Sequence, residues 1–309
     1  MESSPAPRGS FLRAIFISPA EPRLRAGWRL VLQTLLFGIF LMCGFLPLTF
    51  IANGIGSSAG LLLTQTVQLI AVTLSVFLAR RFLDKRSFVS LGLKLNLQAL
   101  FDVIAGILIT MLMMGLIYGI LWAAGWLDFE SFAWETDAIG TVVVQVLLAF
   151  VIFMMVGWNE ELLSRGYHLQ TLESGLNTFW AVLLSSAVFG VLHLGNPNAE
   201  SKWFVATGIF LAGVFLAFGY LRTRQLWLPI GLHIGWNFFE GVVFGFPVSG
   251  MGTYRLLHIT LSGPELWTGG PFGPEAGLIV IPGLAVGFAL VYLYSRKRVA
   301  SRESGDLGR

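Results

Sequence analysis

Long apolar runs separated by short polar segments dominate this sequence of 309 residues. A helix needs about 20 apolar residues to cross the hydrocarbon core of a bilayer. Eight stretches reach or approach that length: Leu30–Ala52, Gly60–Ala79, Leu100–Ala124, Gly140–Trp158 with a helical extension, Leu176–His193, Phe204–Leu221, Leu226–Phe246 and Ala276–Tyr294. Only 12% of the residues are charged, about half the usual share in soluble domains. The sequence therefore predicts an all-α fold, a polytopic bundle of about eight transmembrane helices.

The positions of the basic residues indicate how the bundle is oriented. Loops on the cytoplasmic side of membrane proteins are rich in lysine and arginine. With the N-terminus inside and the helices alternating, all of the 20 Lys and Arg residues except Lys202 and Arg255 fall on the cytoplasmic side. We therefore expect both termini to be cytoplasmic, in a multi-pass protein of the plasma or inner membrane. The lipid bilayer is an expected partner and nucleic acid is not.

The cysteine content restricts the chemistry of the chain. Cys43 is the only cysteine, and it lies in an apolar run. Disulfide frameworks, CxxC redox pairs and multi-cysteine metal sites are therefore excluded.

The stretch "WNEELLSRG", residues 158–166, places two acids and a base at the end of an apolar run. Charges at membrane depth are costly and are usually paired, cavity-lining and functional. Glu161 and Arg165 are four residues apart, so they share a helix face and can form an ion pair. Glu160 is rotated by about 100° from Glu161. This separation predicts a supporting ion pair and one glutamate that faces a cavity.

Two further apolar helices each carry a short polar face. In "FGVLH", Phe189 and His193 are four residues apart, and in "HIGWNFFE", His233, Asn237 and Glu240 lie on one stripe. A glutamate and a histidine from different helices can hold a water molecule that attacks a carbonyl. A His/Asn pair can donate hydrogen bonds to the oxyanion that develops.

Metal binding is an alternative use of the same atoms. Glu160, His193 and His233 together supply the two imidazoles and one carboxylate typical of catalytic zinc. However, the chain has no HExxH motif on one helix, so the three ligands would have to converge from separate helices. The residues leave Zn²⁺ and a metal-free mechanism both open.

The ordered set of motifs resembles the CPBP family of intramembrane proteases, which includes the type II CAAX prenyl proteases and the bacteriocin-processing (Abi) proteins. "EELLSRG" matches EExxxR, "FGVLH" matches FxxxH and "HIGWN" matches HxxxN/D. The resemblance implies that Glu160 and His193 activate the water and that His233 and Asn237 form the oxyanion site. It also implies that Glu161, Arg165 and Phe189 support them. The reaction would be hydrolysis of a peptide bond in a membrane-embedded or lipidated substrate.

The resemblance also divides the chain. Residues 1–28 are expected to form a polar, basic cytoplasmic segment, and residues 29–295 a single transmembrane domain with its protease core at about 140–246. Residues 296–309 are expected to form a basic, disordered tail. A catalytically silent scaffold or bacteriocin-immunity protein is the main alternative. A proton-coupled transporter would use the same acids as a relay, but the sequence shows no inverted repeat of the kind found in many transporters.

Depth in the membrane is the main difficulty for this site. In an alternating topology Glu160 lies near the cytoplasmic end of its helix, whereas His193 lies near the outer end of the next one. Water can be shared if the fourth helix continues to about Gln170, which raises Glu160, or if a short or tilted fifth helix lowers His193. The two side chains should then approach within about 6 Å, because a general base must reach the water it activates.

Overall fold

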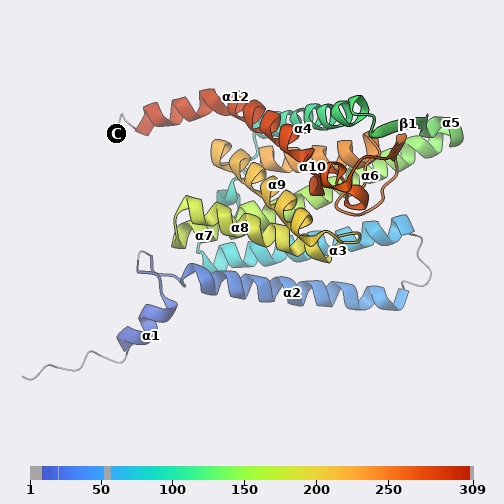
Figure 1. Ribbon diagram of the computed structural model, residues 1–309. Coiled ribbons are helices and arrows are strands. Elements are labelled where there is room, and N and C mark those ends of the chain that lie inside the picture. The colour runs from blue at the N-terminus through green and yellow to red at the C-terminus, as the bar shows by residue number, and fades with distance from the viewer. Residues whose placement is uncertain (1–8, 20, 52–56, 307–309) are drawn as a thin grey trace, which may run out of the picture.

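The computed structural model describes residues 9–19, 21–51 and 57–306 and is almost entirely helical (Figure 1). The long helices are α2 (Ala26–Ile51), α3 (Ser57–Leu78), α4 (Leu97–Ala123), α6 (Ile139–Glu161), α8 (Thr178–Leu192), α9 (Lys202–Thr223) and α12 (Val280–Asp306). The shorter α-helices are α1 (Gly9–Phe16), α5 (Ala133–Thr136), α7 (Leu169–Gly175), α10 (Trp227–Asn237) and α11 (Glu265–Thr268). Three π-helical segments are η2 (Ala79–Leu83), η4 (Leu162–His168) and η6 (Phe238–Val243), and 3₁₀ turns are η3 (Phe88–Leu91), η5 (His193–Gly195), η7 (Gly270–Phe272) and η8 (Pro274–Ala276). The predicted polytopic helical bundle is confirmed.

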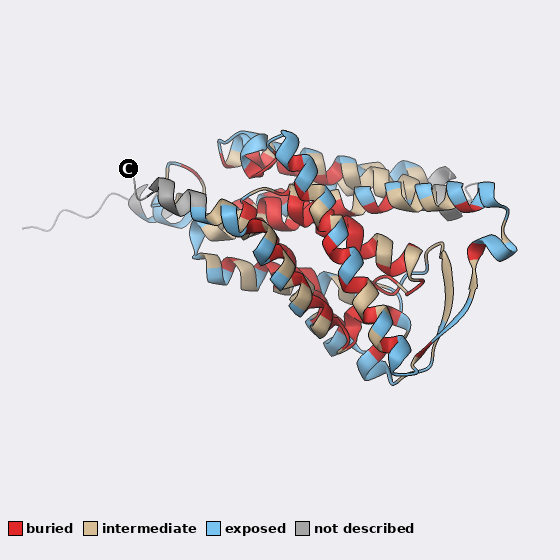
Figure 2. Ribbon diagram, turned by 90° about the horizontal axis from the view of Figure 1, so that it is seen from above, coloured by how far each residue is buried: buried red, intermediate tan, exposed pale blue. Residues whose placement is uncertain are grey.

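Six of the predicted spans are long and apolar enough in the structure to cross a membrane: α2, α3 with η2, α4, α6 with its extension, α8 with η5, and α9. The other two predicted spans correspond to α10 with η6 and to α12. Helix α10 is surrounded by other helices, and every residue from Leu228 to Asn237 is buried. Figure 2 shows this buried centre beneath helices whose outer faces are exposed. The exact number of membrane crossings stays a prediction.

Glycine allows the central helices α4 and α10 to approach closely. A Cβ atom on Gly231 would lie 2.3 Å from the carbonyl oxygen of Val103, and one on Gly106 would lie 2.4 Å from the backbone nitrogen of Leu232. Both distances are far below van der Waals contact, so no larger residue fits without moving a backbone. Small residues serve the same purpose at many helix contacts in membranes.

We expect Gly231→Ala to destabilise the bundle by about 1–3 kcal/mol, the usual effect of overpacking. The matched control is Gly119→Ala in α4, because a Cβ atom at Gly119 meets nothing within 4 Å. The free energy of unfolding of both variants in mixed micelles would be compared with that of the wild type. If Gly231→Ala and Gly119→Ala were equally stable, the close approach of α4 and α10 would not require glycine at position 231.

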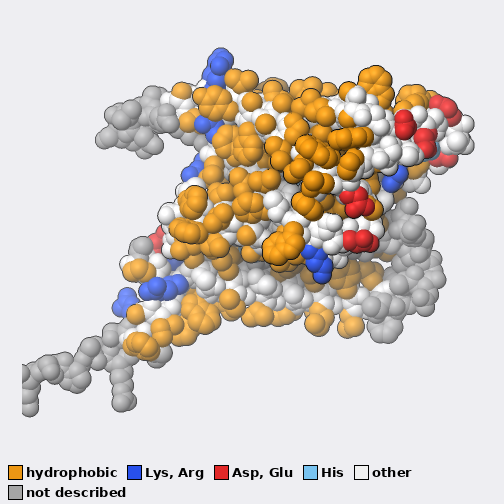
Figure 3. Space-filling view, in the orientation of Figure 1, with side chains coloured by type: hydrophobic (Ala, Val, Ile, Leu, Met, Phe, Trp, Pro, Cys, Tyr) orange, Lys and Arg blue, Asp and Glu red, His pale blue; other side chains and the backbone are white. Residues whose placement is uncertain are grey.

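Charge separates the two ends of the bundle. On the face seen in Figure 3, most Lys and Arg side chains gather at the left end and most Asp and Glu at the right, with a hydrophobic surface between them. Helix α1 and the last turns of α12 both lie at the left end (Figure 1), which we call the basic end. This separation fits the predicted orientation.

The two ends of the bundle contain structure that the sequence did not predict. Residues of "WLDFESFAWETDA" form strand β1 (Leu127–Phe132), which pairs antiparallel with β2 (Leu257–Leu261). The pairing comes from residues more than a hundred positions apart, and a local pattern does not reveal it. The tail predicted to be disordered from residue 296 is helical as far as Asp306, because α12 continues past its apolar part. The expectation for residues 1–8 and 307–309 lies outside the described residues.

Candidate active site

Glu160 and His193 reach the same depth because the helices that carry them form a hairpin with equal arms. Helices α6, η4 and α7 run without interruption to Gly175, which is 15 positions beyond Glu160. After the turn, helix α8 begins at Thr178, and His193 is again 15 positions further along. At 1.5 Å per residue, both side chains lie roughly 22 Å from the turn. The predicted extension of the fourth helix is confirmed, and it removes the difficulty of depth.

Two of the three helices that carry the motifs, α6 and α10, change from α to π geometry within or directly after the motif. Segment η4 begins at Leu162, next to the glutamate pair, and segment η6 begins at Phe238, next to Asn237. Short π segments inside α-helices occur frequently at functional sites. In this protein, η4 begins within the EExxxR motif and η6 begins directly after Asn237.

Glu161 forms the buried centre of a charged network. Its Oε1 atom accepts from Nη1 of Arg165 at 2.7 Å and lies 2.8 Å from Nδ1 of His233. Nη2 of Arg165 donates to the carbonyl oxygen of Gly213 at 3.1 Å. The Glu161 side chain is fully buried and that of Arg165 is 3% exposed. The predicted ion pair is confirmed, and it also fixes the orientation of the His233 ring.

His193 and His233 each use Nδ1 for a hydrogen bond within the protein, so the Nε2 atom of each ring faces Glu160. Nδ1 of His193 is 2.7 Å from the carbonyl oxygen of Phe189, which accepts only if Nδ1 carries the proton. Nε2 of His193 and Nε2 of His233 each lie 3.7 Å from Oε2 of Glu160. This distance is too long for a direct hydrogen bond, and at such a distance a bridging water should be considered. The expected approach of Glu160 to His193 is therefore found.

Phe189 fills the space between these groups. Its ring centroid is 4.7 Å from that of His193 and 6.3 Å from that of His233, in an edge-on arrangement with the latter. The guanidinium carbon of Arg165 lies 4.3 Å from the same centroid, within the range of a cation–π contact. Phe189 thus packs against three of the polar side chains that the sequence singled out.

These groups line a cavity of ≈470 Å³. Glu160, His193, His233 and Asn237 all contribute to its wall, whereas Glu161 and Arg165 lie behind it. The rest of the wall is largely apolar and comes from α3, α6, α8 and α9, with Phe37 of α2 at its edge. Apolar cavities with a few convergent polar groups are typical of binding sites for small or extended ligands.

Comparison with known proteins agrees with this geometry. The family model described as type II CAAX prenyl endopeptidase Rce1-like matches residues 141–239, the part of the chain that carries all three motifs. We call residues 141–239 the Rce1-like domain because of this similarity. A Bacillus subtilis (strain 168) protein named "Putative membrane peptidase YdiL" is 34% identical over 107 residues, which cover 34% of this chain and 41% of that protein. The chain thus aligns with less than half of the length of that relative. The comparisons confirm the resemblance to the CPBP family and support a membrane peptidase.

The three candidate zinc ligands meet only part of what a zinc ion requires. Two atoms bound to one zinc at about 2.1 Å can be no more than about 4.2 Å apart, and each 3.7 Å Glu–His distance satisfies that limit. Within the described parts of the chain, however, no group of three or more His, Cys, Asp or Glu side chains could hold a metal ion as placed. As placed, Glu160, His193 and His233 therefore do not form a set of three zinc ligands, and the use of a metal stays a prediction.

Glu275 contributes to the site although no motif marks it, whereas Glu240 does not reach the cavity. Glu275, which the sequence places in a loop, lines the cavity and is 5% exposed. It accepts from Nε1 of Trp236 at 3.0 Å and from the backbone nitrogen and hydroxyl of Ser249 at 2.8 and 2.7 Å. No motif marks it, because it approaches the Rce1-like domain from a segment beyond β2. Glu240 is fully buried but does not line the cavity, since the π segment moves it away from the stripe of His233 and Asn237.

Proposed function

We propose that the protein is an intramembrane endopeptidase that hydrolyses a peptide bond with a water molecule held between Glu160 and His193. The observation that carries the proposal is the position of Glu160 Oε2, which lies 3.7 Å from a ring nitrogen of each of two histidines. This oxygen is buried and has no hydrogen-bond partner among the described residues. A buried carboxylate oxygen without a partner is costly, and a reactive water would satisfy it.

The arrangement supports a sequence of proton transfers. A water molecule would donate one hydrogen bond to Glu160 and one to the free Nε2 of His193, and Glu160 would accept the proton as the oxygen attacks the carbonyl carbon. The proton on Glu160 would then pass to the leaving amine as the C–N bond breaks. The two products are a new carboxyl terminus and a free amine, so atoms and protons balance.

His233 and Asn237 are suited to stabilise the intermediate. Protonated on both nitrogens, His233 would donate through Nε2 to the oxyanion while Glu161 accepts from Nδ1 and balances the charge. The amide of Asn237, one helical turn further and also on the cavity wall, donates without titrating. Arg165 acts through Glu161, so it is a positioning residue.

The cavity wall supports a substrate that is itself apolar. Apolar side chains, chiefly leucine, phenylalanine and valine, make up more than half of the lining residues. A membrane-embedded peptide or a lipidated peptide, such as one that carries a prenyl group, would bury apolar surface there. Entry from the basic end or laterally from that leaflet is part of the proposal.

The direct test is cleavage by purified protein reconstituted in lipid. A panel of fluorogenic peptides, either prenylated near the C-terminus or membrane-spanning, would be incubated with the wild type and with His193→Ala. We expect the wild type to cleave at least one class and the variant to be slower by about 10²-fold or more, the usual contribution of acid–base groups. A catalytically silent scaffold would cleave none, and undiminished cleavage by His193→Ala would remove the proposed pair.

We expect cleavage to persist after divalent ions are removed, because the three candidate ligands do not form a metal-binding group as placed. The rate would be measured with increasing concentrations of a strong chelator, with a known zinc protease in the same vesicles as the control. A loss of activity that added zinc restores would contradict the metal-free version. It would then assign Glu160, His193 and His233 as ligands and leave the peptidase proposal standing.

A further inference from the structure

A second polar cavity, of ≈370 Å³, lies at the basic end and is separate from the candidate active site. Its wall comes from the segment before α2, the start of α2, the stretch between α3 and α4, α7, and Tyr220 of α9. Gln170 on its wall is ten positions from Glu160 along a continuous helix, or about 15 Å. The two cavities are therefore separate.

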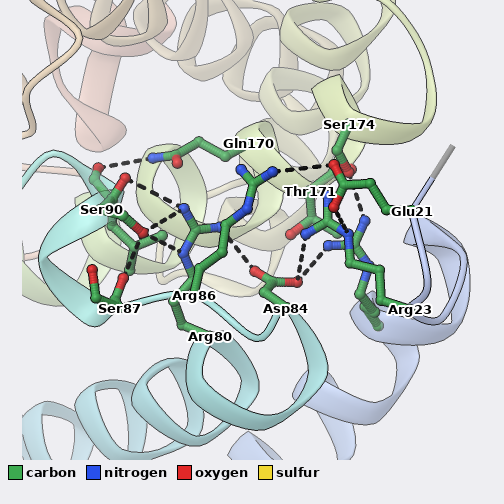
Figure 4. Close-up of polar contacts among 12 residues, drawn as sticks. Glu21, Arg23, Arg80, Asp84, Arg86, Ser87, Ser90, Gln170, Thr171 and Ser174 are labelled. Carbon is green, nitrogen blue, oxygen red and sulfur yellow. Dashed lines mark hydrogen bonds and ion pairs between the residues drawn. The ribbon is translucent and has the colours of Figure 1, made fainter.

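Three buried arginines converge on one aspartate in this cavity, as Figure 4 shows in part. Arg29 bonds to Oδ1 of Asp84, Nη1 of Arg80 donates to Oδ2 at 2.9 Å, and Nη1 of Arg23 lies 3.8 Å from Oδ1. All four side chains are less than a tenth exposed. One carboxylate cannot neutralise three guanidinium groups.

The remaining charges at the cavity do not remove this excess. Arg86 and Arg23 share Glu21, at 3.1 and 2.7 Å. Glu173 also lines the cavity, but it is paired with Arg224 outside it at 3.0 Å. Four arginines thus face two available carboxylates, leaving two positive charges uncompensated.

One hydrogen-bond donor among these arginines is unsatisfied, and two serines hold the guanidinium groups in position. Nε of Arg29, whose side chain is 2% exposed, has no hydrogen-bond partner within the described chain. The hydroxyl groups of Ser90 and Ser174 line the same wall and hold the guanidinium groups of Arg80 and Arg29 in place, at 2.9 and 2.6 Å. Burial, together with the neighbouring Arg29, lowers the pKa of Arg23, which is the effect expected where positive charge is in excess.

We propose that this cavity binds a phosphate group, with the four arginines as its charge partners. Arginine forks match the geometry of phosphate oxygens and bond to them in pairs. The cavity lies among the basic loops, where lipid headgroups meet a membrane protein, and clusters of arginine there attract anionic lipids. The headgroup of an anionic phospholipid and a soluble phosphate share this chemistry.

Binding by purified protein in neutral detergent tests the proposal independently of any cleavage. Short-chain phosphatidylglycerol, short-chain phosphatidylcholine and inorganic phosphate would each be titrated while the unfolding temperature and Kd are measured. We expect phosphatidylglycerol to raise the unfolding temperature and phosphatidylcholine to have no effect. A shift with phosphatidylglycerol alone identifies a lipid headgroup, and an equal shift with inorganic phosphate identifies a soluble ligand. No shift with either would overturn the proposal.

Variants locate the binding. Arg86→Gln and Arg23→Gln each remove one charge from the cavity, and each is expected to weaken binding about tenfold, which corresponds to about 1.4 kcal/mol. Arg29 and Arg80 are left intact, because their loss would leave Asp84 without its closest partners. The matched control is Arg81→Gln, an exposed arginine next to Arg80 that is not on the cavity wall. An equal loss in Arg81→Gln would show that binding depends only on general surface charge, which would contradict the proposed site.

Discussion

Replacing Glu160 with glutamine is expected to reduce peptide cleavage by about 10²–10⁴-fold, the range that a general base contributes. The amide keeps the size of the side chain but cannot accept the proton of the attacking water. The fold should be unaffected, because Glu160 is one-third exposed to the cavity and approaches its two histidines only to 3.7 Å. Initial rates and the free energy of unfolding would be measured on the same reconstituted samples.

Glu200→Gln is the matched control for this variant. Glu200 lies on the surface after the His193 turn and is exposed. The same chemical change there should leave both the rate and the stability as they are in the wild type. If Glu160→Gln retained the wild-type rate, Glu160 could not be the base, even if the protein proved to be a peptidase.

Arg165→Met is expected to have the largest effect on stability, a loss of about 3–5 kcal/mol, because it leaves a buried carboxylate without its main partner. Glu161 is fully buried, and the carbonyl oxygen of Gly213 would lose its donor as well. The contact of the guanidinium group with Phe189 would also disappear. The free energy of unfolding in mixed micelles measures the change.

A double variant distinguishes the effect of an unpaired buried carboxylate on stability from the effect of the lost side-chain packing. In Glu161→Gln/Arg165→Met no buried carboxylate is left unpaired at this position, so the double variant should be more stable than Arg165→Met alone. A coupling of this kind is what a double-mutant cycle detects between residues in contact. If the double variant were as unstable as the two single changes added together, Glu161 and Arg165 would not interact as the structure indicates.

The polar side chains of the candidate site were predictable because each lies at helical spacing within its own apolar helix. The spacing of Glu161 and Arg165 alone predicts their ion pair. The approach of Glu160 to His193 required a further assumption, and the structure supplies it in the continuation of the fourth helix beyond the charged motif. These predictions depend on local periodicity, which a single sequence contains.

The parts that were not predicted depend on contacts between distant segments. Glu275 reaches the cavity through a loop whose path is fixed by Trp236 and Ser249, and nothing near it in the sequence shows this. The pairing of β1 with β2 also joins segments that are far apart in the sequence. The π segments depend on how a helix packs against its neighbours, so a pattern of apolar residues does not distinguish them from α-helix.

The π segment η4 has a consequence for the angular phase of the helix on its two sides. A π turn accommodates one more residue than an α turn, so the residues after it are offset by about 100° from where a regular α-helix would place them. Helix α7 consequently places Gln170 on the wall of the cavity at the basic end and brings Ser174 to within 2.6 Å of Arg29. The irregularity next to Glu161 thus sets which face of α7 lines that cavity, and it links the geometry of the two cavities through one helix.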